Sequence, residues 1–140
     1  MEYKRFNNDI IVRIDKGEEI LTELKNVALK ENILLASISG LGATNDFTIG
    51  VYDLENKVFC PNHFTGTYEI VSLVGTIDTM DNEYYSHVHM SAGDKDGHVV
   101  GGHLKEAYVS ATAEIVLHVI DGKINRKKDD DTGLNLFDFE

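Results

Sequence analysis

The sequence predicts an α+β domain, in which a mostly antiparallel β-sheet packs against one main N-terminal helix. Only one segment, from about residue 17 to residue 31, has the apolar spacing of a long amphipathic helix. Most of the remaining chain alternates apolar and polar residues, or forms short apolar runs bounded by turn residues. A parallel α/β fold would need a helix after nearly every strand, and the sequence predicts only one helix.

The first elements are a strand over residues 9–14 and the helix that follows it. Asp15 is the expected N-cap, with Glu18 three residues later as its capping-box partner. Asn32 is placed to end the helix. The apolar stripe that would face the sheet consists of Ile20, Leu21, Leu24, Val27 and Ala28.

The rest of the chain is read as strands separated by glycine-rich or polar turns. Gly40 and Gly42 are expected to break the chain, and residues 53–56 to form a turn. The last long strand alternates cleanly, and its polar face, which includes Thr112 and Glu114, is suited to water, a partner subunit or a site. The predicted strands cover residues 33–39, 47–52, 57–65, 68–77, 84–91 and 108–120.

Length and composition indicate one domain over residues 1–140, with a C-terminal tail from about 121 to 140. The chain has 140 residues, of which 42% are hydrophobic, enough for a core that needs no metal or disulfide. A single cysteine, Cys60, excludes an intrachain disulfide. The first residues lack the apolar run of a signal peptide, and no stretch approaches 18 apolar residues. We therefore expect a cytoplasmic protein without a membrane span.

The charge balance argues against direct binding to nucleic acid. Lys and Arg number 13 against 24 Asp and Glu, which gives a net charge of −11. Affinity for a phosphate backbone depends on cations that displace counterions, and this chain has a deficit of them. The only basic cluster, residues 126–128, is followed at once by three aspartates and is interpreted as a solvated turn before the tail.

The strongest chemical signal is a set of three histidines. His87 and His89 are two residues apart within a predicted strand, so both rings lie on one face. Gly101 and Gly102 permit a tight turn that would return His103 over that strand. Three imidazoles with a fourth position left open are typical of a zinc site that binds a ligand or activates water. We therefore predict a divalent metal, best matched by zinc, on His87, His89 and His103.

Two acidic residues within strands are candidates for a supporting role. Glu69 and Glu114 could orient a ligand imidazole or act near metal-bound water. The alternative is that each carboxylate makes a hydrogen bond or ion pair with a neighbouring subunit. The other histidines, His63, His98 and His118, lie outside the cluster and are interpreted as ordinary surface or satisfied residues.

The same segment resembles the plants and prokaryotes conserved (PPC) domain family. The resemblance spans nearly the whole chain, including Gly17–Ile20, Ser37–Ala43, Tyr68–Gly75 and Gly133-Leu134-Asn135-Leu136. Its most specific block runs from His87-Val88-His89 through Gly101-Gly102-His103-Leu104. It implies an α+β fold around an antiparallel sheet, a homotrimer, and metal, usually zinc, on the three matching histidines. The family is commonly labelled DNA-binding, but this chain lacks the basic Arg-Gly-Arg-Pro hook of the plant members.

Several alternatives stay open at the level of sequence. Cupin barrels also carry His-x-His on a strand, but they have a glycine six residues earlier, where this chain has Asp81. Three functions are compatible with the site. The first is a metal-binding homotrimer that holds a small ligand or acts in regulation. The second is a DNA-associated protein, and the third is a zinc-dependent hydrolase or lyase acting on a small substrate.

Overall fold

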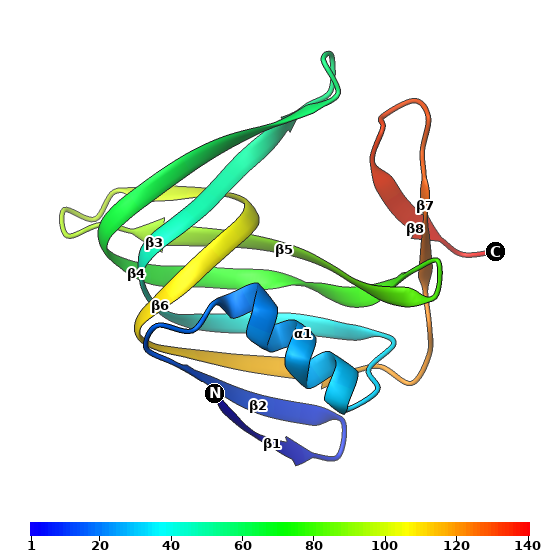
Figure 1. Ribbon diagram of the computed structural model, residues 1–140, viewed down its shortest axis with the longest axis horizontal. Coiled ribbons are helices and arrows are strands. Elements are labelled where there is room, and N and C mark those ends of the chain that lie inside the picture. Colours follow the sequence, from blue (N-terminus) through cyan, green and yellow to red (C-terminus); the bar gives the residue numbers. More distant parts are fainter.

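The computed structural model describes residues 1–140 and contains eight strands and one helix (Figure 1). All strand pairs are antiparallel except the short parallel contact between the fourth and seventh strands. The predicted α+β class is therefore confirmed. The elements are β1 (Glu2–Phe6), β2 (Asp9–Asp15), α1 (Ile20–Lys30), β3 (Ala36–Asp53), β4 (Val58–Met80), β5 (Glu83–Gly93), β6 (Val99–Val119), β7 (Asn125–Lys128) and β8 (Asn135–Asp138).

Four long strands form a closed ring of pairings. β3 pairs with β4 and β6, and β5 pairs with the same two strands from the other side. The sheet curls accordingly in Figure 1, where β6 bends from its contact with β5 toward β3. β1 and β2 extend the sheet beyond β6, and the β7–β8 hairpin stands beside the far end of β4.

The core lies between α1 and one face of the sheet. The helix contributes Ile20, Leu24, Val27 and Ala28, as its apolar spacing predicted. Each large apolar side chain buried in this way stabilises the fold by roughly 1.5–3 kcal/mol. The helix is too short, at 11 residues, to qualify as a membrane span, and no other helix is present. The opposite face of the sheet carries the histidines. The helix does not cover it, and the β7–β8 hairpin covers one end of it at Asp78.

The helix begins later than predicted. Its first residue is Ile20 and its N-cap is Glu19, whose carboxylate accepts from the backbone N–H groups of Leu21 and Thr22. Residues 17–19 instead run beside β6, where the Gly17 N–H donates to the carbonyl of Val109. Gly17 has φ +88°, a conformation that suits glycine and delays the helix. Tertiary pairing therefore overrides the predicted Asp15 cap.

The expected glycine break within the third strand is also wrong. β3 continues through Gly40 and Gly42, with only a shift in register between them. A side chain at Gly42 would meet the Thr112 carbonyl oxygen at 2.4 Å, so glycine allows β6 to approach closely here. The two strands predicted over 57–65 and 68–77 are likewise one continuous strand, β4, which bends with the curled sheet.

The basic cluster at residues 126–128 is part of a strand and not of a solvated turn. β7 and β8 form a hairpin within residues 121–140, and Arg126 is buried rather than exposed. Its guanidinium makes two hydrogen bonds with the Asp78 carboxylate, at 2.6 and 3.0 Å, and both side chains are almost fully buried. The local run of aspartates is therefore not the partner of Arg126, and the interpretation of this segment as a solvated turn is wrong.

Candidate metal centre

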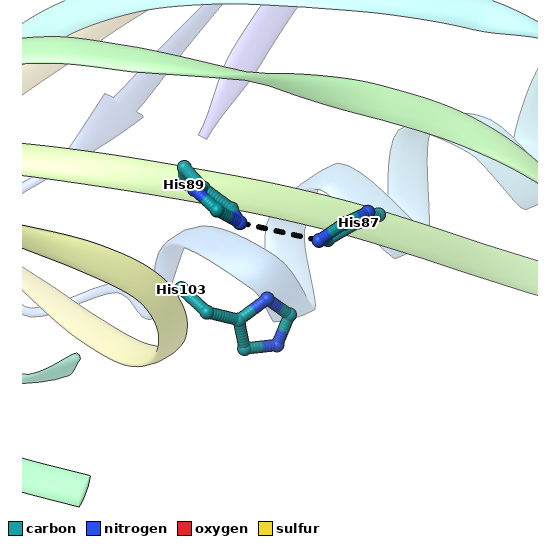
Figure 2. A group of neighbouring side chains, drawn as sticks. All are labelled: His87, His89 and His103. Carbon is teal, nitrogen blue, oxygen red and sulfur yellow. Dashed lines mark hydrogen bonds between the residues drawn. The ribbon is translucent and has the colours of Figure 1, made fainter. Parts of the chain in front are cut away.

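β5 presents His87 and His89 on the face of the sheet that points away from α1, as strand alternation predicts. The intervening Val88 and the following Met90 point into the core, and each is 2% exposed. The two histidines are exposed and lie side by side (Figure 2). Gly75 of β4 lets the strands approach closely, since an added Cβ would meet the His87 carbonyl oxygen at 2.2 Å.

His103 reaches the same place by strand pairing and not by a turn. It lies in β6, directly opposite His89 in the β5–β6 ladder. The turn is formed earlier, by residues 94–98, and β6 has already begun at Val99. The predicted Gly101–Gly102 turn is therefore wrong. Gly102 instead allows β6 to approach β3 closely, because an added Cβ would lie 2.6 Å from the carbonyl oxygen of Gly50.

The three imidazoles converge at a distance suited to one metal ion. All three offer a ring nitrogen within 4.8 Å of the others. The Nε2 atoms of His87 and His89 are 3.2 Å apart, and the ring of His103 faces this pair (Figure 2). Two nitrogens bound tetrahedrally to zinc at about 2.0–2.1 Å are about 3.3–3.4 Å apart, so the His87–His89 spacing fits this ion.

The surroundings favour the neutral, metal-binding form of the rings. His87 is exposed as a residue, but its ring is partly desolvated, and this desolvation lowers its pKa. His89 and Arg126 act in the same direction. Burial also lowers the pKa of His103, with His87 and His89 contributing. The ring of Phe59 packs edge-on against His103, with centroids 5.6 Å apart.

The buried Asp78–Arg126 ion pair lies next to the histidines on the same sheet face. Thr76 is opposite His87 in the β4–β5 ladder, and Asp78 is opposite Tyr85 two pairs further on. The Thr76 hydroxyl donates to Asp78 at 2.8 Å. Sequence reasoning missed this arrangement. Its only signal was the alternation of the polar residues Thr76 and Asp78 with the apolar Ile77 in β4.

The structure does not bring the two candidate carboxylates to the histidines within one chain. Glu69 is exposed on β4 opposite Gly93, and Glu114 is exposed on β6 opposite Arg13. Neither hydrogen-bonds to the three imidazoles, whose only mutual hydrogen bond joins His87 and His89. The other three histidines lie on the surface, each beside a carboxylate: His63 with Asp46, His98 with Asp94, and His118 with Asp9.

A second group of potential ligands occupies the β5–β6 turn. Asp94, Asp96 and His98 have side-chain atoms within 4.8 Å of one another. One oxygen of Asp94 accepts from the backbone N–H groups of Asp96 and His98, and the other contacts the His98 ring. These bonds are sufficient to explain the turn.

Comparison with solved structures shows the same fold in proteins from bacteria and archaea. A candidate DNA-binding protein from Bacteroides thetaiotaomicron is 32% identical, with a TM-score of 0.96 over 99% of this chain and 96% of that one. A plant- and prokaryote-conserved protein from Pyrococcus horikoshii is 36% identical, with a TM-score of 0.86 over 98% and 93%. A metal-containing protein from Archaeoglobus fulgidus is 32% identical, with a TM-score of 0.86 over 97% and 96%.

Sequence comparison agrees with the structural one. No curated protein matches the chain. The family model for the plants and prokaryotes conserved domain, also abbreviated PCC, matches residues 1–121. This match includes the helix, the ring of long strands and all three histidines of the cluster. The chain therefore belongs to the plants and prokaryotes conserved domain family.

Proposed function

We propose that this protein binds one divalent metal ion through His87, His89 and His103, and that it holds a small ligand at the remaining coordination position. The observation that carries the proposal is the convergence of three ring nitrogens within 4.8 Å, with two of them 3.2 Å apart. The related Archaeoglobus fulgidus protein is described as metal-containing.

Zinc is the metal best suited to this donor set. Imidazole nitrogen is a preferred ligand of zinc, and three protein ligands with an open position are typical of sites that bind water or a substrate. When bound, zinc would act as a Lewis acid toward an oxygen-containing ligand. The protein's own contribution is to hold three neutral imidazoles in a fixed arrangement on paired strands.

Ligand binding is a better match to the site than hydrolysis or DNA binding. Hydrolysis at a metal commonly uses a nearby acid or base, and Glu69 and Glu114 are not in contact with the histidines. DNA binding is suggested by the description of the Bacteroides thetaiotaomicron protein. The net charge of −11 opposes it here, since counterion release requires a cationic surface.

A homotrimer is part of this proposal. A row of exposed residues, three of them apolar, crosses the sheet face that points away from α1. Starting from His89, successive strands place Val74, Ser39, Val116 and Ile11 opposite one another. Val74 is 49% exposed, Val116 38% and Ile11 45%. The part of this row beyond Val74, formed by Val116 and Ile11, is suited to burial against another subunit, which leaves Val74 open beside His89. Light scattering should give three times the chain mass of 15.6 kDa, and a value near 15.6 kDa would contradict the trimer.

Metal analysis tests the proposed function directly. The protein should be produced without an affinity tag and purified without chelator, and its metal content measured by elemental mass spectrometry. We expect about one zinc per chain, with equilibrium dialysis showing that the metal-free protein takes up the same amount. A stoichiometry near zero in both measurements would contradict the proposal.

A further inference from the structure

A hollow of about 230 Å³ opens beside the histidine cluster on the same sheet face. Its lining includes Ser72, Val74, His89, Ser91, Gly101 and Gly102. His89 is therefore shared between the cluster and the hollow. Pockets for drug-sized ligands run to about 300–1,000 Å³, so this hollow is suited to a smaller molecule.

The hollow exists because β6 carries glycine where it faces Ser91. Gly101 is opposite Ser91 in the β5–β6 ladder, two residues before His103 and hence on the same face. A Cβ at Gly101 would meet its nearest neighbours, in Met90 and Ser91, at 3.4 Å, and its φ is not in the left-handed region. The backbone therefore does not demand glycine here, and a side chain would project into the hollow.

Two hydroxyl groups line the hollow from adjoining strands. Ser72 and Ser91 are opposite each other in the β4–β5 ladder, and both are partly buried. The hydrogen bonds in this part of the sheet join His87 to His89 and link Thr76, Asp78 and Arg126, which leaves the two serine hydroxyls available. The lining contains no carboxylate, lysine or arginine.

The spacing between the hydroxyls and the histidines limits the length of the ligand. Residues two apart on a strand are separated by about 7 Å, which is the interval from His89 to Ser91. A group bound to a metal on the three histidines could therefore be joined to a second group at the serines by a chain of only a few atoms. With no charged residue in the hollow, the charge of the ligand belongs at the metal end.

We propose that the hollow is a subsite for a short-chain carboxylic acid with a neutral polar group at its far end. The carboxylate occupies the open metal position, and a hydroxyl or amide hydrogen-bonds to Ser72 and Ser91. Val74 contacts the connecting methylene groups. This inference rests on the proposed metal function and adds the class of ligand and the two residues that select it.

The test uses the cobalt(II)-loaded full-length protein, because cobalt reports ligand binding through its visible absorption. The probes are butanoate and 4-hydroxybutanoate, which differ by one hydroxyl distant from the carboxylate. We expect the hydroxy acid to bind about tenfold more tightly, as one or two new hydrogen bonds would give. The Ser72→Ala/Ser91→Ala double variant should bind both acids equally. The control is Ser37→Ala, at an exposed position of β3 outside the hollow, which should retain the preference for the hydroxy acid.

A second variant fills the hollow. Gly101→Val should weaken both acids at least about tenfold while cobalt binding is unchanged, because the side chain takes the ligand's place. Equal affinities for the two acids in the unmodified protein would overturn the inference, as would a preference that persists in the double serine variant. Failure of the unmodified protein to bind cobalt is a different result, which would overturn the proposed metal function itself.

Discussion

His103 lies directly opposite His89 in the antiparallel ladder between β5 and β6. Opposed residues in such a ladder have Cβ atoms about 4.5–5.5 Å apart on the same face. Since His87 lies on that face too, backbone pairing alone brings three imidazoles together. The site is therefore built on rigid strands, and we expect the fold to survive removal of the metal.

Replacing any one of the clustered histidines should remove the metal. His87→Ala, His89→Ala or His103→Ala should each lower metal affinity by more than about 100-fold, since even residues that only support a ligand are worth 10–100-fold. Equilibrium dialysis against zinc measures this. The matched controls are His63→Ala, His98→Ala and His118→Ala, whose rings are exposed beside surface carboxylates. Unchanged metal content in the first three variants would contradict the site.

Metal retention should extend to lower pH than ordinary histidines allow. Burial lowers the pKa of both His87 and His103 from the ordinary value of 6.5, so protons compete for these rings only at lower pH. Zinc release followed during acid titration should therefore have its midpoint below that of a peptide containing the same His-Val-His segment. A midpoint equal to or above that of the peptide would contradict this.

The same lowered pKa values predict how the metal-free protein responds to acid. Between the folded pKa and 6.5, the unfolded chain binds more protons than the folded chain does. The free energy of unfolding should therefore fall as the pH drops below 6.5, and part of this loss should disappear in a His87→Gln/His103→Gln variant. Urea unfolding at a series of pH values, with and without the substitutions, separates this contribution from those of the carboxylates.

Breaking the Asp78–Arg126 ion pair should be strongly destabilising. Asp78→Ala leaves a buried guanidinium without its carboxylate and should cost about 3–5 kcal/mol in the free energy of unfolding. The control in the same hairpin is Lys127→Ala, which removes the ion pair between this exposed lysine and Asp138 and should change the free energy of unfolding far less. Equal effects of the two substitutions in urea unfolding would show that the buried pair is not what holds the hairpin.

The two neighbouring glycines of β6 should respond differently to alanine. A Cβ at Gly102 would lie 2.6 Å from the backbone of Gly50, so Gly102→Ala should cost about 1–3 kcal/mol or more. Gly101→Ala meets only contacts of 3.4 Å, mainly with Ser91, and should change stability by about 0.5 kcal/mol or less. Thermal unfolding of both variants tests the difference. Similar destabilisation by both would show that the close approach of β3 is not the cause.

Duplex DNA should bind weakly or not at all at physiological salt. A chain with net charge −11 has few cations with which to release counterions. Fluorescence anisotropy with a random-sequence duplex at about 0.15 M salt should show no binding below roughly 10 μM protein. Sub-micromolar binding would contradict this and favour a local basic patch or a bound partner.

Much of the fold and part of the site could be predicted from local pattern. The helix stripe of Ile20, Leu24 and Val27 is buried as its spacing indicated, because residues repeated at the 3.6-residue period lie on one face of a helix, and this face packs on the core. His87 and His89 share a face because strand side chains alternate. These properties depend only on residues near one another in the chain, so the sequence alone determined them.

Tertiary structure decided the features that depend on distant residues. The position of His103 follows from its pairing with His89 and not from the glycines beside it. Glu19 replaces Asp15 as the helix cap because residues 17–19 pair with β6. Arg126 is buried because Asp78, 48 residues earlier, lies where β7 meets β4. Strand register and ion pairing across the sheet bring together groups whose separation along the chain carries no local signal, and only the folded backbone specifies them.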